Sequence, residues 1–404
     1  DNLDIARSLQ AERRRLASLQ SKALPGVSEA ATPGWIRQLV SAADSYVFER
    51  LESGGRRRFS VIAGYPWFGD WGRDTMIALP GLTLATGRPQ IAREILETFG
   101  AYLSEGMLPN VFPGSGQEPE YNTVDAALWF IEAWRAYVQV TDDLAAVARV
   151  FPTLSEIVTA YRDGTRFGIS RDPQDGLIRA GVPGQQLTWM DARANGVEVT
   201  PRHGKPVEIN ALWHNALRVM SDFARRLGRA DEDYEGLAAS AADGFRRYRR
   251  GEGAGLFDVL DGPDGNDDSV RPNQLFAISL PYSPLDDAAA RHAVVEECRE
   301  RLLTPFGLRS LAADEPHYCG RYLGGPAERD GCYHQGPVWG WLLGHYALAE
   351  YRVTSDKSLA LSRLEAMSKH LSEAGLGQIS EIFDGDPPHG PRGAPAQALS
   401  LIHI

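Results

Sequence analysis

The stretch VDAALWFIEAWRAYVQVTDDLAAVARVFPTLSEIVTAY, residues 124–161, decides the fold. Its apolar residues recur three and four positions apart, which predicts one helix over 124–140 and a second over 144–161. The first helix is apolar or aromatic most of the way round, and a short link at 141–142 joins it to the second. We expect a helix of the first kind to be buried on both sides.

The same periodicity runs through the rest of the chain and predicts about twelve helices. Apolar helices such as 338–351 alternate with helices that keep a polar face, such as 231–249. This alternation predicts two concentric rings, and therefore an all-α fold: a six-hairpin (α/α)6 barrel in which strands are nearly absent. The other predicted helices cover 35–51, 74–84, 88–103, 208–227, 272–280, 286–303 and 359–371, and a last one opens near 394.

The connections indicate where function lies. Links that follow the apolar helices are short, whereas links that precede them are long and rich in Gly, Pro, Asp and aromatic residues. Helix connections usually run to about 8 residues, and longer ones are often functional. We therefore expect the active site at the one rim where the long loops emerge. These loops are 64–73, 106–123, 163–207, 251–271, 305–335 and 375–393.

Composition narrows the class of protein. A net charge of −11 and a pI near 5.4 argue against a nucleic-acid surface. The sequence contains no apolar run of 18 residues, the length that a membrane span needs. The charged helix expected at 1–20 lacks the apolar stretch of a signal peptide. Cys298, Cys319 and Cys332 are too few and too scattered for a disulfide framework, so a reducing, cytoplasmic location is expected. The sequence defines no oligomeric state.

The segment GYPWFGDWGRD, 64–74, holds the densest group of chemically useful side chains. Trp67, Phe68 and Trp71 alternate with Asp70, Arg73 and Asp74. Aromatic faces stack on sugar rings, while carboxylates and guanidinium groups hydrogen-bond hydroxyls. The alternative is a buried Arg–Asp pair that pins an aromatic turn.

Two further carboxylates follow in apolar surroundings. PEYNTVDAALWF places Asn122 and Asp125 three apart near the rim, although Asn122 also fits an N-cap. QQLTWMDAR places Asp191 directly after Trp189 and Met190. Apolar surroundings raise a carboxyl pKa, which suits a general acid that works near neutral pH. The alternative for Asp191 is a loop residue that caps a turn.

The second half of the chain adds charged groups at the starts of apolar helices. PRHGKPVEINALWHN brings Lys205 and Glu208 to one such helix, and YHQGPVWGW brings His334 to another. Near the end, Glu381 stands between two isoleucines. Separate carboxylates in apolar surroundings, beside aromatic loops, indicate glycoside hydrolysis. Cyclases and phosphorylases also use helical toroids and stay open as alternatives at this point.

Together these segments resemble the motifs of the C-terminal domain of glycogen debranching enzymes. WFGDWGRDT, EYNTVDAALWF, TWMDA with PRHGKPVEINALW, YHQGPVW and QISEIFDGDPPH occur in the family's order over about 63–397. The resemblance implies a six-hairpin α/α barrel that acts as an amylo-α-1,6-glucosidase on glycogen or its limit dextrins. It also implies that no metal or organic cofactor is needed.

The resemblance assigns residue roles as well. Asp191 is expected to be the general acid and Glu381 the general base of an inverting reaction, for which two carboxyl groups stand about 6.5–9.5 Å apart. Two alternatives remain: an α-1,4-glucan or oligosaccharide hydrolase of glucoamylase type, and a non-catalytic glucan-binding module. Substrate binding is assigned by the resemblance to Trp67, Asp70, Trp71, Arg73, Asp74, Asn122, Asp125, Trp189, Lys205, Glu208 and His334.

The ends of the chain depart from the family pattern. Residues 1–30 are expected to be a linker helix from an upstream domain, and 31–404 to form the barrel. The chain alone is expected to lack the transferase activity of larger family members. The family continues AQAW into a full last helix, whereas this chain reads AQALSLIHI, with Leu399 in place of the tryptophan. A truncated last helix is therefore expected.

Overall fold

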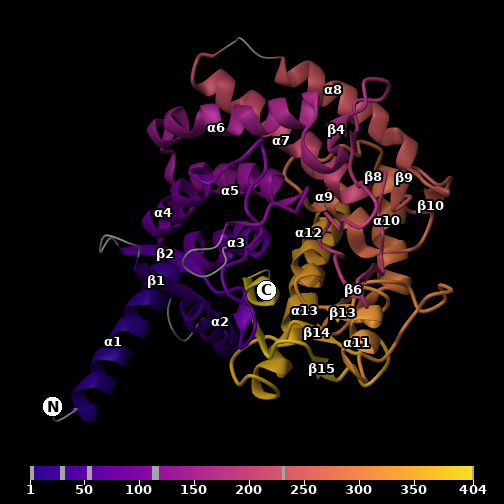
Figure 1. Cartoon of the computed structure of the whole chain (residues 1–404). Coiled ribbons are helices and arrows are strands. Elements are labelled where there is room, and N and C mark those ends of the chain that lie inside the picture. Colours follow the sequence, from indigo (N-terminus) through magenta and orange to yellow (C-terminus); the bar gives the residue numbers. More distant parts are fainter. Residues whose placement is uncertain (1–3, 28–31, 52–56, 112–117, 230–232, 403–404) are drawn as a thin grey trace.

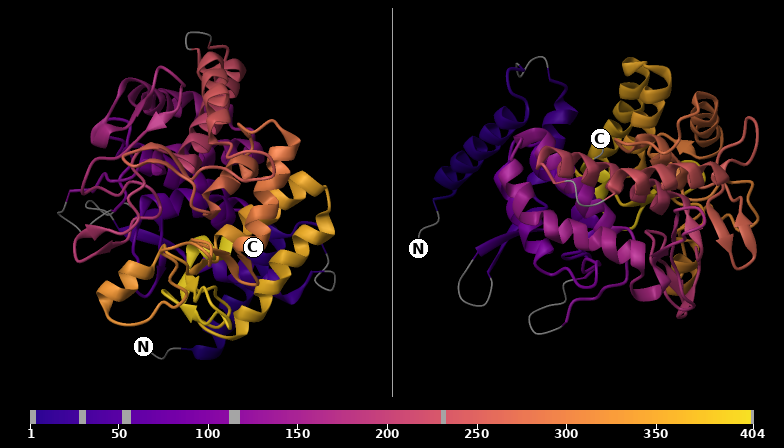
Figure 2. Two further views of the ribbon diagram at one scale, coloured as in Figure 1. Left: turned by 90° about the vertical axis from the view of Figure 1, so that its right-hand side faces the viewer. Right: turned by 90° about the horizontal axis from the view of Figure 1, so that it is seen from above.

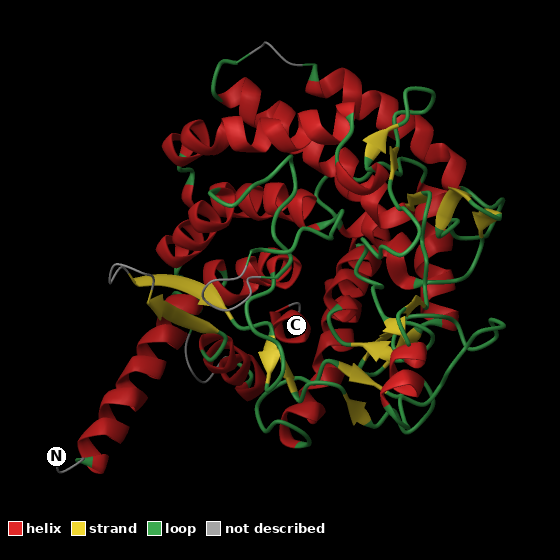
Figure 3. Cartoon of the chain, in the orientation of Figure 1, coloured by secondary structure: helices red, strands yellow, loops and turns green. Residues whose placement is uncertain are grey.

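The computed structural model describes residues 4–27, 32–51, 57–111, 118–229 and 233–402. Helices dominate this part of the chain, and the strands are short (Figure 3). Parts of three predicted segments lie outside the described residues: 1–3 and 28–30 of the linker helix, 112–117 of one rim loop and 231–232 at the start of a helix.

The helices form an inner and an outer ring, which confirms the predicted barrel (Figure 1). Around the inner ring, α3 contacts α5, α5 contacts α7, α7 contacts α9, α9 contacts α12, and α14 returns to α3. The inner helices are α3 (Gly72–Leu79), α5 (Ala126–Thr141), α7 (Val207–Arg226), α9 (Phe276–Ser279), α12 (Leu342–Thr354) and α14 (Ala398–Ile402). The π-helix Pro80–Leu84 continues α3, and the 3-10 turn Pro272–Leu275 precedes α9. The outer helices are α2 (Gly34–Asp44), α4 (Pro89–Gly100), α6 (Leu144–Asp163), α8 (Tyr234–Phe245), α10 (Ala288–Arg301) and α13 (Lys357–Met367).

Local sequence signals explain the hairpin of α5 and α6. Trp134 of α5 is fully buried, as expected for a helix that is apolar on most sides. Asp142 adopts a left-handed conformation (φ 53°) at the C-cap of α5, and Asp143 caps α6 by accepting from the Ala146 N–H at 2.9 Å. The chain therefore reverses direction within two residues at this rim. The long loops that we expect to carry function lie at the other rim.

Several predicted helix boundaries are wrong, and in two places a predicted helix end is a strand that pairs elsewhere. Helix α2 ends at Asp44, and Val47–Leu51 is strand β1, paired antiparallel with β2 (Arg57–Val61). Likewise, Val338–Trp339 is strand β13, and α12 begins only at Leu342. Short apolar runs fit a buried strand and a buried helix equally well, so periodicity alone does not separate them.

A five-stranded antiparallel sheet joins the late rim loops. In order, it contains β11 (Leu303–Thr304), β12 (Gly307–Arg309), β13, β14 (Ile382–Phe383) and β15 (Pro391–Arg392). Within it, Trp339 pairs with Ile382, so the YHQGPVW and QISE segments lie side by side. Nearby, Cys319 and Cys332 form a disulfide, while the buried Cys298 is free. The prediction from the scattered cysteine spacing is therefore wrong for this pair, because the loop between the two residues folds back and brings them together.

The first and last segments of the barrel close its ring. Strand β16 (Ala396–Gln397) pairs antiparallel with β3 (Gly64–Tyr65), and the Ala398 N–H donates to the Ala63 carbonyl at 2.9 Å. The short helix α14 then packs against α2 and α3. Leu399, at the position where the family pattern has tryptophan, is buried there.

The remaining described elements lie at the chain start and in the long loops. Helix α1 (Ile5–Ala23) packs on α2 and extends away from the barrel, with Leu19 as its buried residue (Figure 2). Helix α6 is long and apolar enough to cross a membrane by length and composition, but it packs on α5 and α7 as an outer helix. The other elements are α11 (Pro326–Cys332), β4 (Ser170–Arg171), β5 (Ile178–Arg179), β6 (Arg193–Ala194), β7 (Val197–Glu198), β8 (Lys205–Pro206), β9 (Val259–Gly262) and β10 (Gly265–Asp267).

Candidate active site

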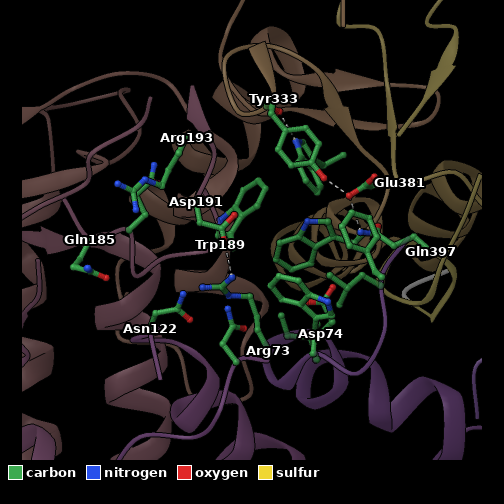
Figure 4. Close-up of a pocket in the computed structure, with 18 residues that line it drawn as sticks. Arg73, Asp74, Asn122, Gln185, Trp189, Asp191, Arg193, Tyr333, Glu381 and Gln397 are labelled. Atoms are coloured by element: carbon green, nitrogen blue, oxygen red, sulfur yellow. Dashed lines mark hydrogen bonds and ion pairs between the residues drawn. The ribbon is translucent and has the colours of Figure 1, made fainter. Parts of the chain in front are cut away.

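A pocket of about 290 Å³ opens at the rim formed by the long loops (Figure 4). Five of the six predicted loops contribute to its wall, together with the starts of inner helices. This volume lies at the small end of the range of ligand pockets, about 300–1,000 Å³, and suits a ligand of sugar size. The wall comprises Phe68, Trp71, Arg73, Asp74, Ile77, Asn110, Asn122, Gln185, Gln186, Trp189, Asp191, Arg193, Tyr333, Trp339, Trp341, Glu381, Gln397 and Leu399.

Close backbone packing places the WGRD segment in this wall. The Gly72 N–H donates to the Asn110 carbonyl at 2.8 Å, and a Cβ at position 72 would meet the Pro109 carbonyl oxygen at 1.9 Å. Only glycine fits this contact. Helix α3 begins at this point, so Arg73 and Asp74 enter the pocket from its first turn.

Arg73 joins two carboxylates at the base of the pocket. Its Nε donates to both oxygens of the buried Asp125, at 2.9 and 2.8 Å, and its Nη1 donates to Asp191 Oδ2 at 2.8 Å. A third contact runs from Nη2 to the Leu187 carbonyl at 3.2 Å. Asp125 therefore lies behind the wall and fixes Arg73, whereas Asp191 lies in the wall itself.

Asp191 lies in more polar surroundings than the sequence predicts. Its side chain is 36% exposed and is paired with Arg73. The neighbouring Trp189 forms the apolar part of the wall, with its ring edge-on to Trp339 and Trp341 at centroid distances of 5.2 and 5.3 Å. The indole N–H of Trp189 donates to Asn273 Oδ1 at 2.7 Å, which fixes the ring.

Glu381 enters the same pocket from the five-stranded sheet. It precedes β14 directly, and its buried carboxylate accepts hydrogen bonds from the Tyr333 hydroxyl and, at 2.8 Å, from the Ala394 N–H. Burial raises the pKa of Glu381 to about 7, although these two hydrogen bonds act in the opposite direction. The negative charges of Asp74 and Asp191 raise this pKa further, so the three carboxyl groups share one electrostatic environment.

Asp74 is a third titratable group in the wall. Loss of hydration raises its pKa to about 7, Arg73 opposes this shift, and the negative charges of Asp191 and Asp125 add to it. The pocket thus brings together one Arg-paired carboxylate and two carboxyl groups that titrate near neutral pH. Such a set is typical of sites that carry out acid–base chemistry.

Three predicted binding residues lie away from the pocket in ion-pair networks. Lys205 is buried and contacts three carboxylates within 2.9 Å, from Asp172, Asp175 and Asp261. Asp70 is paired with Arg50 at 3.5 Å and accepts a hydrogen bond from Ser60. The family resemblance assigned both residues to the sugar, but neither lines the pocket, and their partners are charged and polar groups of the protein. Glu208 is the third and belongs to a separate network.

That network supports Trp189 from behind. Glu208 and Asp258 both accept from the buried Arg202. Asp258 Oδ1 also accepts from Asn273 Nδ2 at 2.8 Å, and Asn273 in turn accepts from the Trp189 indole. Glu208 therefore reaches the pocket only through this chain of contacts.

Two predicted aromatic residues also lie outside the wall. Trp67 is 67% exposed, at the tip of the tight turn that closes between the Gly64 and Phe68 backbones. His334 is fully buried behind Trp339, with the two rings stacked at 5.0 Å. Burial and the nearby positive charges of arginines hold the His334 pKa well below its ordinary value, so this ring is neutral at pH 7.

Several wall residues were missed by the sequence reasoning although their segments were singled out. Tyr333, Trp339 and Trp341 all belong to YHQGPVWGW, where His334 was chosen instead. The aromatic spacing of that segment was a usable signal. Phe68 was singled out with Trp67 and Trp71 for the same aromatic signal but was not assigned to substrate binding. No comparable signal marked the others, which are Ile77, Asn110, Gln185, Gln186, Arg193, Gln397 and Leu399.

Comparison with known proteins identifies the family of this chain. Residues 39–404 match the family described as amylo-alpha-1,6-glucosidase. The glycogen debranching enzyme of Saccharomyces cerevisiae is 28% identical over an alignment of 389 residues, which covers 72% of this chain and 25% of the yeast protein. The chain thus spans about a quarter of the length of this relative.

Solved structures share the fold. A GH63 mannosylglycerate hydrolase from Thermus thermophilus, in complex with Tris, has a TM-score of 0.63 at 15% identity and covers 92% of this chain and 99% of that chain. An uncharacterized conserved protein from the same organism has a TM-score of 0.60 at 15% identity, with 85% and 94% covered. At this identity the likeness shows the fold alone, whereas the family match spans most of the sequence. The chain therefore belongs to the amylo-α-1,6-glucosidase family of glycoside hydrolases.

Proposed function

We propose that this chain removes single α-1,6-linked glucose residues from a branched α-glucan by hydrolysis with inversion. The observation that supports this most directly is that Asp191 and Glu381, nearly two hundred positions apart in sequence, line one sugar-sized pocket (Figure 4). They come from different loops, and no hydrogen bond joins them within the described residues. The family match and the debranching activity named for the yeast relative support the choice of linkage.

In this mechanism, Asp191 protonates the oxygen of the bond that breaks. Glu381 accepts a proton from a water molecule, which attacks the anomeric carbon from the opposite face and gives β-glucose. The pKa of about 7 at Glu381 suits a general base, because a base is most effective when its pKa lies near the working pH. Arg73 holds Asp191 in place from one side while Trp189 borders the site from the other.

The central test replaces each carboxylate by its amide. Asp191→Asn and Glu381→Gln should each lower kcat on an α-1,6-glucosyl-cyclodextrin by about 10²- to 10⁴-fold, since each side chain transfers a proton. Proton NMR of the first product formed by the unchanged chain should show β-glucose. Retained hydrolysis in either folded variant would contradict the assigned roles, and α-glucose as first product would contradict inversion.

Linkage preference needs its own comparison. Glucose release from the α-1,6-glucosyl-cyclodextrin should exceed release from linear maltooligosaccharides at equal concentration. Faster release from the linear substrates would make the chain an α-1,4-glucan hydrolase instead. Binding of both without any glucose release would make it a glucan-binding module.

A further inference from the structure

One part of the pocket wall carries polar atoms that the protein leaves unpaired. Among the described residues, the side-chain oxygens of Asn110, Asn122 and Gln186 are buried and have no hydrogen-bond partner. All three residues line the pocket. Buried polar groups are nearly always paired, so three unpaired amide oxygens among the residues that line one pocket indicate a ligand with hydroxyl groups.

The position of this wall relative to the carboxylates defines which part of a ligand it meets. In Figure 4, Asn122, Gln185 and Arg193 lie on the side of Asp191 that is away from Glu381. A general acid stands beside the oxygen that joins the released sugar to the leaving group, and the general base stands across the released sugar. The leaving group therefore extends beyond Asp191, toward the amides.

The side chains here have the chemistry of a site for a neutral carbohydrate. Amides both donate and accept hydrogen bonds and carry no charge, which matches sugar hydroxyls. The outer edge is marked by Arg193, which is exposed and donates to the Gly196 carbonyl at 2.8 Å. The opposite side of the pocket differs, because the ring of Tyr333 lies there beside Glu381 (Figure 4).

We propose that Asn122 and Gln185, with the neighbouring Gln186, form the binding site for the leaving glucan, separate from the site that holds the released glucose. This inference rests on the proposed function and adds to it the residues that recognise the substrate beyond the cleaved bond. The family resemblance assigned Asn122 to the released glucose, whereas this proposal assigns Asn122 to the leaving group.

Local structure ties this site to the acid. Gln186 Nε2 donates to the Ala192 carbonyl at 2.6 Å, next to Asp191. Gln186 is therefore unsuitable for a test, because its loss would also displace the acid. Among the described residues, no such hydrogen bond runs from the side chain of Asn122 or Gln185 to the backbone beside Asp191, so these two positions carry the experiment.

The experiment compares two substrates with the same glucose and different leaving groups. The α-1,6-glucosyl-cyclodextrin has a glucan leaving group, whereas α-glucosyl fluoride has none of the hydroxyls that the amides would bind. Asn122→Ala and Gln185→Ala should each lower kcat/KM for the cyclodextrin about tenfold, the usual order for a lost hydrogen bond. For the fluoride, kcat/KM should stay within about twofold.

Two further variants serve as controls for this experiment. Gln174→Ala makes the same change on an exposed turn that does not line the pocket, and it should leave both substrates unaffected. Asp74→Asn changes a carboxyl group of the wall that interacts with Glu381, and it should lower kcat/KM for both substrates. Equal losses on both substrates in the Asn122 and Gln185 variants, or no loss on either, would overturn the inference. Failure of the unchanged chain to hydrolyse either substrate would instead overturn the proposed function.

Discussion

At the scale of single residues, the contact between Tyr333 and Glu381 modifies how the pocket responds to pH. The Tyr333 hydroxyl donates to the Glu381 carboxylate and thereby favours its charged form. Burial acts more strongly and leaves the pKa of Glu381 at about 7. Because the proposed base must be deprotonated, kcat/KM should rise with pH through the region of pH 7.

Replacement of this tyrosine gives a prediction with a clear sign. Tyr333→Phe removes the hydrogen bond that lowers the Glu381 pKa, so that pKa should rise and the acid limb of the pH–kcat/KM profile should move to higher pH. Tyr322→Phe is the matched control, because its ring packs on Tyr333 at 5.6 Å. An unchanged acid limb in Tyr333→Phe would show that Glu381 does not limit the profile.

At the scale of elements, a single glycine sets the position of the proposed base. Gly393 follows β15 with φ 64°, and a Cβ there would meet Glu381 Oε2 at 2.3 Å. The next residue, Ala394, donates its N–H to the same oxygen. The turn after β15 therefore approaches the carboxylate as closely as the backbone allows.

An added methyl group at this turn should displace Glu381. Gly393→Ala should lower kcat on α-glucosyl fluoride about 10²-fold, the order expected when a reacting group moves by about 1 Å. Gly390→Ala is the control in the same loop, because a Cβ there meets its nearest atom at an ordinary 3.5 Å. Circular dichroism should show both variants folded. Equal activity in the two would mean that Glu381 tolerates displacement.

Elements also show how far the sequence could predict the site. The 3.6-residue period predicted the helices, and the alternation of buried and half-buried helices predicted the two rings and the functional rim. Periodicity does not predict which partner a polar side chain at the start of a helix contacts. Lys205 and Glu208 lie beside pocket segments in sequence, but their partners are distant carboxylates and Arg202, which periodicity does not reveal. The sheet that brings Trp339 beside Ile382 was missed for the same reason, because two-residue strands carry no pattern.

At the scale of the whole molecule, the pocket carboxyls lower stability at high pH. The folded-state pKa of Asp74 is about 7 against an ordinary 3.8, and that of Glu381 is about 7 against 4.5. The folded chain thus holds these protons more tightly than the unfolded chain. The resulting stability is fully present below about pH 4 and is lost as the pH rises through 7.

This linkage is measurable as a difference between two melting curves. Asp74→Asn stays neutral at every pH, so its Tm should fall less between pH 5 and pH 8 than the Tm of the unchanged chain. Asp264→Asn, on the exposed turn between β9 and β10, serves as the control. A Tm of Asp74→Asn that runs parallel to that of the unchanged chain would contradict the raised pKa of Asp74.

The seam between β3 and β16 has a consequence for biosynthesis. The wall contains Phe68 and Trp71 from early in the chain and Gln397 and Leu399 from its last stretch. A ribosome adds about 5–20 residues each second, so the early half of the wall is exposed for many seconds before the late half exists. Nascent chains consequently hold their aromatic side chains without a completed pocket, and the proposed reaction can begin only after translation has passed the seam.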